Sequence, residues 1–247
     1  GQYGFPLHCS QKFGIKLVFY GENSAEYGNN PKDNLTPTRS YKDIGLINDE
    51  KSYVGGIEVN EISKKYDIPM SALSDYIPPK VEDIAKSEME WHYLGFYLKW
   101  HPQANYYFAT KYKFQPAPER NAGSFSRYSG LDDKMDDFNY YFLYVKYGQG
   151  RASYDTAQEI RRGDINRDEA KALIERYDGE YPTRFENEVY EYWSINKIPG
   201  ANQKMIDAFE VKEVNRKYIE KLSDKFRSPH LWKYDKTKKN WKLNYDL

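Results

Sequence analysis

Two carboxylates follow a short apolar run near the beginning of the chain. The run, Ile15–Tyr20, ends in Gly21-Glu22-Asn23, and Glu26 follows. Carboxylate oxygens are ligands that Mg²⁺ prefers, and a magnesium ion held in this way often bridges nucleotide phosphates. The pattern therefore predicts a cofactor-binding loop with Glu22 and Glu26 as metal ligands. A polar turn that merely closes a strand accounts for the same residues equally well, because motif matches in a single sequence are weak.

A buried strand would have to position this loop. An apolar run without alternation is typical of a parallel strand covered on both faces, and ligands bind beyond the carboxyl ends of such strands. A short helix is predicted over Phe5–Phe13, and Trp91–Trp100 predicts a second buried strand, with a helix as the alternative. A parallel sheet needs further strands joined by crossovers. We therefore expect an α/β fold of which this chain holds only a part.

A second candidate is the turn that runs from Lys146 through Gly148 and Gly150 to Arg151. If Arg151 begins a helix, the backbone N–H groups and the helix dipole favour an anion there, and the guanidinium can bind phosphate or carboxylate through two hydrogen bonds. The alternative is a plain helix–helix turn with glycine in the left-handed region, which is the commoner case. The Gly-Lys-Ser/Thr ending of a P-loop is absent from this turn.

An acidic run at 132–137 could bind a metal or could place carboxylates against the positive end of a helix dipole. We favour the dipole role for Asp136 and Asp137, which should be partly solvated, and leave Asp132 and Asp133 open. The four histidines are scattered without metal-ligand spacing, and the sequence has no Gly-x-Ser-x-Gly elbow. A zinc site or an acyl-transfer nucleophile therefore has little support.

The apolar periodicity changes near residue 129. Upstream, we expect a long loop over 28–56 and helices over 60–66, 81–90 and 104–112, the last beginning after His101-Pro102. Downstream, one helix is expected from a capping box at Ser129 and Asp132, a second over 151–162 and a third from a box at Asn166 and Glu169. Three more are expected over 185–195, 202–209 and 214–226, before a solvated tail. The predicted domains are an α/β portion at 1–128 and a helical region at 129–247.

The composition limits the classes of function. With 37 basic and 37 acidic residues the net charge is zero, so nothing attracts nucleic acid to the whole surface. The single cysteine excludes an internal disulfide and fits a reducing compartment. No segment has the length and apolar character of a membrane span, and no signal sequence is evident, so we expect a cytoplasmic protein. The 17% aromatic content predicts a core built from Tyr, Phe and Trp.

Four segments carry a resemblance to a known family. In chain order they read LVFYGENSAEYGN, YLGFYLKWHPQANYYFA, GSFSRYSGLDDKMDDFNYYFLYVKYGQGRAS and INRDEAKALIERYDGEYP. They resemble the C-terminal part of the N-acetyl sugar amidotransferases, bacterial enzymes related to the pseudaminic acid and O-antigen amidination proteins. The resemblance implies an ATP-pyrophosphatase-type fold. It also implies conversion of an acetamido group on a nucleotide-linked sugar into an acetamidino group, with ATP, Mg²⁺ and ammonia from a glutaminase partner, in lipopolysaccharide or flagellin-glycan precursor synthesis.

The resemblance also suggests site residues. Gly21, Glu22, Asn23 and Glu26 would bind the cofactor. The nucleotide-sugar pocket would be formed by Lys99, Arg127, Asp132, Asp133 and Lys134, with Lys146, Gly148, Gly150 and Arg151 as an anion clamp. The family's Ser-Gly-Gly-x-Asp-Ser phosphate loop and a Cys-containing motif are absent from this sequence, so we expect the chain to be inactive alone. No residue has the profile of a covalent nucleophile.

Two alternatives remain open. The first is another adenylylating ATP-pyrophosphatase, such as a tRNA-thiolating enzyme, although the neutral charge and the lack of paired cysteines count against it. The second is a non-catalytic module whose helical region after Ser129 docks a glutaminase. The helical region could do so whether or not the first half of the chain binds ATP.

Overall fold

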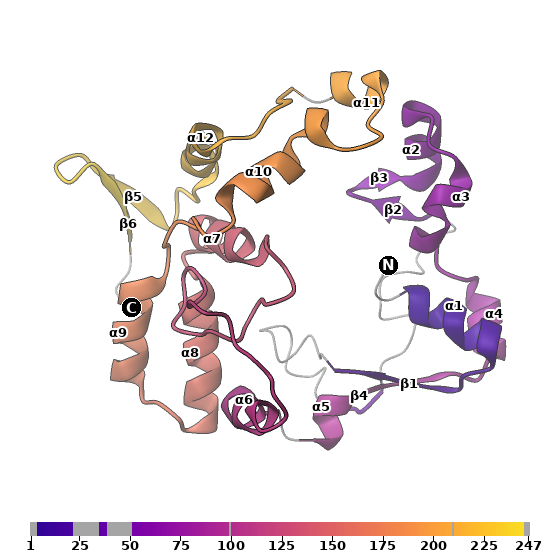
Figure 1. Cartoon of the computed structure of the whole chain (residues 1–247), viewed down its shortest axis with the longest axis horizontal. Coiled ribbons are helices and arrows are strands. Elements are labelled where there is room, and N and C mark those ends of the chain that lie inside the picture. Colours follow the sequence, from indigo (N-terminus) through magenta and orange to yellow (C-terminus); the bar gives the residue numbers. More distant parts are fainter. Residues whose placement is uncertain (1–3, 22–34, 39–50, 99, 209, 245–247) are drawn as a thin grey trace. The chain divides into compact units, whose positions relative to one another are not determined.

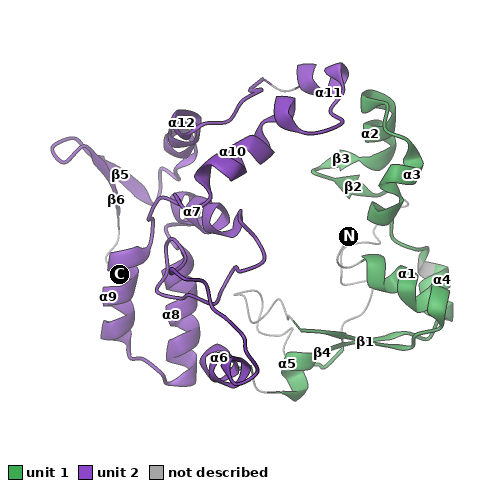
Figure 2. Ribbon diagram, in the orientation of Figure 1, with its two compact units in different colours: residues 1–100 green, residues 101–247 purple. Residues whose placement is uncertain are grey.

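The computed structural model describes residues 4–21, 35–38, 51–98, 100–208 and 210–244. The chain divides into two compact units, Gly1–Trp100 and His101–Leu247, which Figure 2 shows in green and purple. The division falls earlier in the chain than the predicted domain boundary at 128/129. The assignment of residues 1–128 to a nucleotide-binding portion therefore stays a prediction.

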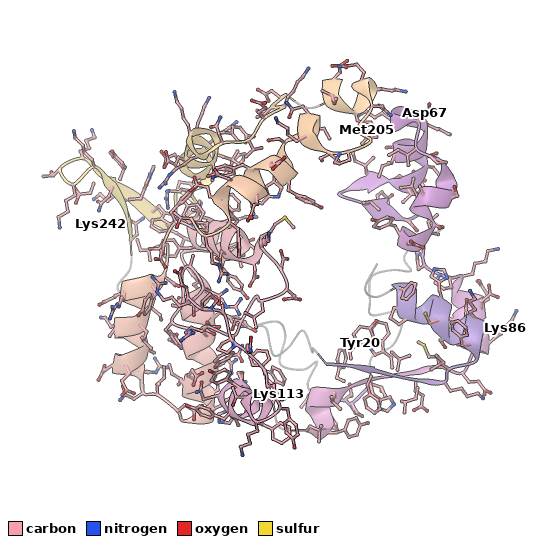
Figure 3. All side chains as sticks on the ribbon, in the orientation of Figure 1. Tyr20, Asp67, Lys86, Lys113, Met205 and Lys242 are labelled. Atoms are coloured by element: carbon pink, nitrogen blue, oxygen red, sulfur yellow. The ribbon has the colours of Figure 1, made fainter. Side chains whose placement is uncertain are left out.

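A two-stranded parallel sheet is central to the first unit. Strand β1 (Leu17–Tyr20) follows helix α1 (Gly4–Phe13) and pairs in parallel with β4 (Glu90–Tyr93), so that Tyr20 lies opposite Tyr93. Trp91 is buried with Leu7 of α1, and the ring of Tyr20 stacks on it at 4.1 Å. Tyr20 is labelled in Figure 3. The parallel pair confirms the α/β class, whereas the ATP-pyrophosphatase fold stays a prediction.

Strand β1 is less buried than its apolar sequence indicates. Leu17 and Phe19 are 49% and 50% exposed, so the prediction of a strand covered on both faces is wrong for the described part of this unit. Side chains alternate across a strand, and the described core residues contact only one of the two faces. The Phe19 ring lies near His92 and Tyr97, which cover it partly.

The second predicted strand is shorter than expected. It ends at Tyr93, and the chain then forms the one-turn helix α5 (Leu94–Tyr97), which leaves Phe96 and Tyr97 47% and 51% exposed. The predicted strand over Trp91–Trp100 is therefore wrong beyond its third residue. A short apolar run without alternation has no period that separates a strand from a helical turn.

The rest of the first unit consists of a hairpin and short helices. Strands β2 (Tyr53–Val54) and β3 (Ile57–Glu58) meet at Gly55 and Gly56, which both have positive φ, as a tight hairpin turn requires. Helix α2 (Val59–Tyr66) follows directly with Glu58 as its N-cap, so it begins one residue before the predicted range of 60–66. Val59 N–H donates to the Ser52 carbonyl at 2.8 Å. The remaining elements are α3 (Met70–Leu73), η4 (Ser74–Tyr76) and α4 (Val81–Lys86).

The second unit is mostly helical, as predicted. Its elements, shown in Figure 1, are α6 (Pro102–Thr110), α7 (Asp136–Tyr147), α8 (Arg151–Arg162), α9 (Arg167–Tyr177), α10 (Glu186–Trp193), η5 (Ile195–Lys197), α11 (Gln203–Asp207), α12 (Arg216–Phe226), β5 (Trp232–Asp235) and β6 (Asn240–Leu243). Helices α8 and α9 lie side by side (Figure 1). An aromatic-rich core joins α7, α10 and α12 through Phe138, Val189, Tyr190 and Ile219.

Local signals fix several helix ends. Asn166 and Glu169 form the predicted capping box of α9, and the His101 ring accepts a hydrogen bond from Ala104 N–H at the start of α6. The predicted start of the next helix at Ser129 is wrong, because α7 begins only at Asp136. There the Asp133 carboxylate accepts a hydrogen bond from Met135 N–H at 2.8 Å, which holds a turn before the helix.

The tail forms a hairpin that the sequence did not predict, and most of its described residues after Trp232 are exposed, as expected of a solvated terminus. Strands β5 and β6 pair in antiparallel fashion, and Trp232 is 5% exposed because it packs against Tyr144 and the Arg227 guanidinium. Lys242, labelled in Figure 3, lies 3.1 Å from the Asp235 carboxylate. Among the described residues, no helix combines the length and the apolar character that crossing a bilayer requires.

Candidate functional site

A polar loop of the second unit, residues 117–133, brings the charged residues together. It connects α6 to α7 and has no regular secondary structure for most of its length. Its first part closes on itself: Ala117 N–H donates to the Arg127 carbonyl at 2.8 Å, and the Arg127 guanidinium donates twice to the Ala117 carbonyl at 3.0 and 2.9 Å. Arg127, a predicted substrate residue, thus holds its own loop while its side chain remains exposed.

Arg151 is the centre of a buried charge network beneath this loop. Its side chain is 12% exposed, with Nη1 3.0 Å from Asp136 Oδ2 and Nε 3.1 Å from Asp155 Oδ1. The guanidinium lies over the Tyr140 ring at 4.3 Å. Ser124 of the loop donates its hydroxyl to Asp155 Oδ2 at 2.5 Å, so the network reaches from α7 and α8 into the loop. Burial raises the pKa of both Asp136 and Asp155 above the ordinary carboxyl value.

The N-terminus of α8 binds a carboxylate, and that carboxylate is the chain's own Asp178. Gly150 N–H donates to Asp178 Oδ2 at 2.9 Å, and Ser153 donates its N–H and its hydroxyl to the two carboxylate oxygens at 3.2 and 2.5 Å. A Cβ on Gly150 would lie 2.7 Å from Asp178 Oδ1, so the close approach requires glycine. Burial raises the pKa of Asp178, against the effect of these hydrogen bonds.

Arg151 is the first residue of α8, as predicted, whereas the role of this turn as an anion clamp for the substrate stays a prediction. In this structure its anions are Asp178, at the helix terminus, and the two carboxylates that bind Arg151. Gly148 ends α7 with φ 73°, and its N–H donates to the Tyr144 carbonyl at 2.8 Å. Lys146 is exposed, and its ammonium lies 5.0 Å from the centre of the Tyr147 ring. These contacts fasten the start of α8 to α7 and to the residue that follows α9.

A pocket of about 400 Å³ opens beside the loop. Its lining residues come from two segments, Glu119–Ala122 of the loop and Glu180–Arg184 after α9. Arg120 and Glu180 join the two segments through paired hydrogen bonds of 2.6 and 2.7 Å, and Gly123 N–H donates to the same carboxylate at 2.9 Å. The hydrogen bond from Arg120 lowers the pKa of Glu180.

A buried polar cluster shares Arg184 with the pocket. Asn121, which is 2% exposed, donates from Nδ2 to Asp137 Oδ1 at 3.3 Å, and Arg184 Nη2 lies 3.4 Å from Asp137 Oδ2. Asp137 is 6% exposed, so the prediction that it is partly solvated is wrong. The side chain instead faces Asn121 and Arg184, because residues 121 and 184 close over the first turn of α7. Three buried atoms of this cluster make no hydrogen bond with any residue in the described part of the chain: Asn121 Oδ1, Asp137 Oδ2 and Arg184 Nε.

The remaining predicted site residues that the structure describes belong neither to the Arg151 network nor to the pocket. Asp132, Asp133 and Lys134 are exposed before α7, and Lys134 lies 3.4 Å from Glu188. Gly21 is exposed directly after β1. Glu22, Asn23, Glu26 and Lys99 lie outside the described residues. Within the described part of the chain, no group of His, Cys, Asp and Glu side chains could hold a metal ion.

The sequence did not indicate the residues that bind the loop and the start of α8. Asp155, Asp178, Glu180 and Arg184 come from α8 and from the segment after α9, far from the loop in sequence. The one signal that points to two of them is the acidic stretch Asp178-Gly179-Glu180, which follows the helix with the capping box. Its position at the end of a helix predicts a turn and not a set of contacts.

One comparison with known families decides the relationship of this chain. The sequence profile described as "LPS biosynthesis protein WbpG-like, C-terminal domain" matches residues 122–246. The chain belongs to this family. The match includes Arg151, Asp155, Asp178 and most of the pocket lining, and it confirms the resemblance to the C-terminal part of a lipopolysaccharide biosynthesis protein. A comparison with curated proteins finds no match.

Proposed function

We propose that the chain belongs to an enzyme that converts the N-acetyl group of a nucleotide-linked sugar into an acetamidino group. Ammonia would come from a glutaminase partner, and the product would enter a lipopolysaccharide or a related surface glycan. The match of residues 122–246 to a family of lipopolysaccharide biosynthesis proteins carries this proposal. Two of the four segments that resemble the amidotransferases, at 123–153 and 165–182, lie within the matched region.

ATP with Mg²⁺ would supply the activation that an amide oxygen needs before it can leave. The proposed cofactor residues are Gly21, Glu22, Asn23 and Glu26. Gly21 is exposed at the carboxyl end of a parallel strand, the position at which α/β sheets commonly bind ligands, and this supports the proposal. The other three lie outside the described residues.

The loop residues would bind and orient the sugar nucleotide. Arg127, Asp132, Asp133 and Lys134 are exposed on one loop and offer both donors and acceptors. Ser124 of the loop donates to Asp155, which Arg151 also binds, and Ala152 N–H of α8 donates to the Gly123 carbonyl at 2.9 Å. These contacts hold the loop against α8, and a loop held in this way loses little further entropy when a ligand binds. Arg151 is therefore proposed as a positioning residue rather than as a group that touches the substrate.

A deletion of the gene in its own host tests the proposal. The surface glycan of the deletion strain should lack an acetamidino sugar and carry the corresponding acetamido sugar, as detected by mass spectrometry of the purified glycan. Reintroduction of the intact gene should restore the acetamidino group. An unchanged glycan composition after deletion would contradict the proposed reaction.

A further inference from the structure

We propose that the pocket between Glu119–Ala122 and Glu180–Arg184 binds the sugar ring of the substrate, a neutral polyhydroxylated group. This inference rests on the proposed function, which supplies the class of substrate, but the pocket itself is independent of the residues that the sequence suggested. None of the predicted site residues lines it. Its volume of about 400 Å³ falls within the range of small-molecule sites, roughly 300–1,000 Å³.

One part of the pocket wall is already fully bonded and therefore rigid. Arg120 donates to both oxygens of Glu180 and also to the Asn121 and Ser124 carbonyls, at 3.1 and 3.2 Å. Its guanidinium lies over the Tyr177 ring at 4.8 Å. Groups held in this way cannot turn toward a ligand without breaking several contacts, so they shape the pocket rather than bind its occupant.

The other part of the wall keeps free hydrogen-bonding capacity. The Glu119 carboxylate and the Thr183 hydroxyl make no hydrogen bond or ion pair with any residue that the structure describes. Of the Arg184 nitrogens, only Nη2 has such a partner, Asp137. The pocket thus presents a charged acceptor, a hydroxyl that both donates and accepts, and a guanidinium donor. Sugar hydroxyls both donate and accept, so they can satisfy all three groups at once.

The charge balance favours a neutral ligand over a phosphate. Two arginines and two glutamates line the pocket, and their charges sum to zero. Asp137, which is paired with Arg184, brings the local sum to −1. A phosphate dianion would meet the unpaired Glu119 carboxylate and would have to compete with Glu180 and Asp137 for the arginines. A sugar ring meets no such repulsion.

Ligand binding by pocket variants of the intact protein tests the inference. The probes are N-acetylglucosamine and inorganic phosphate. Their binding is measured by saturation-transfer NMR and by isothermal titration calorimetry. N-acetylglucosamine should bind, and phosphate should not displace it. Glu119→Gln should weaken the binding roughly tenfold, because it replaces a charged acceptor by a neutral one, and Thr183→Val should weaken it several-fold.

Matched substitutions outside the pocket serve as controls. The controls are Glu191→Gln on α10 and Thr237→Val in the turn of the C-terminal hairpin. Both make the same chemical change at an exposed side chain away from the pocket, so they should leave the binding unchanged. Thermal unfolding of every variant should match that of the unmodified protein, because neither Glu119 nor Thr183 has a side-chain partner to lose. Absence of binding by the unmodified protein, unchanged binding by both pocket variants, or displacement by phosphate would overturn the inference.

The same variants separate failure of the pocket from failure of the proposed function. If the intact enzyme amidates a sugar nucleotide and the pocket variants keep an unchanged KM for it, the pocket assignment is wrong while the function stands. If N-acetylglucosamine binds in the pocket but no N-acetyl sugar nucleotide is amidated, the pocket stands and the proposed reaction is wrong.

Discussion

At the scale of single residues, Arg151 differs from its prediction, because its side chain is buried instead of open to an external ligand. Its place after Gly150 at the start of a helix suggested a group that grips an external phosphate. In the structure it lies between Asp136 and Asp155 and over the Tyr140 ring, so its charge is already matched by carboxylates of the same unit. A buried cation of this kind is costly to remove because its removal leaves buried carboxylates without a partner.

Arg151→Met should strongly destabilise the protein. With both carboxylates left unpaired, we expect the free energy of unfolding to fall by about 3–5 kcal/mol, as measured by urea denaturation. Arg161→Met on the same helix is the control, because Arg161 is exposed, and it should cost no more than about 0.5 kcal/mol. Equal effects of the two substitutions would show that Asp136 and Asp155 do not depend on Arg151.

The Arg120–Glu180 pair should make stability depend on pH in the acid range. Arg120 lowers the pKa of Glu180 from its ordinary value of 4.5, so the folded state binds fewer protons there than the unfolded state. The pair therefore stabilises the fold above pH 4.5, and this contribution is lost as the pH falls through the lowered pKa.

Comparison with Glu180→Gln measures that contribution. The difference in unfolding free energy between the unmodified protein and this variant should be about 1 kcal/mol near neutral pH, because the pair is partly exposed, and should shrink toward low pH. The measurement is urea denaturation at a series of pH values. A difference that grows on acidification would mean that the sign of the pKa shift is wrong.

At the scale of elements, helix ends that depend on nearby residues were predicted correctly, whereas elements that depend on distant contacts were not. The bounds of α8 and the capping box of α9 follow from residues within a few positions of each helix end, and the sequence predicted both. The start of α7 and the end of β4 were predicted wrongly and the tail hairpin was not predicted, because each depends on packing or on a turn that apolar periodicity does not encode. The carboxylate at the α8 terminus likewise comes from the end of α9.

Gly179 follows α9 and lies close to Tyr144 of α7, so its substitution tests how the segment after α9 packs against α7. It has φ 80°, and a Cβ there would lie 2.2 Å from Cε1 of Tyr144 on α7. Gly163 has a similar φ of 83°, but a Cβ there meets nothing within 4 Å. Gly163→Ala should therefore cost only the strain of a left-handed residue, about 1–2 kcal/mol.

Gly179→Ala should cost a further 1–3 kcal/mol or so, because the ring of Tyr144 must move from a packed position. Thermal or urea unfolding of the two variants gives the comparison directly, since backbone strain is common to both. Similar losses would show that the segment after α9 does not pack against α7 as described.

At the scale of the whole molecule, the sequence was informative about relationship and less so about the site. The four collinear segments predicted a family that the match at 122–246 confirms at the level of lipopolysaccharide biosynthesis. The pocket escaped prediction because its walls, 119–122 and 180–184, are about 60 residues apart and are joined by hydrogen bonds from Arg120 and Gly123 to Glu180. Pairings of this kind follow from tertiary packing and have no local sequence signature.

Transfer of ammonia nitrogen to a sugar nucleotide tests the central claim most directly. The protein expressed from its complete reading frame would be incubated with ATP, Mg²⁺, ammonium carrying a heavy nitrogen isotope and a panel of nucleotide-linked N-acetyl sugars. We predict a product in which the acetamido oxygen is replaced by the labelled nitrogen, formed only when ATP is present, as detected by mass spectrometry. A folded protein that incorporates no label into any member of the panel would contradict the account.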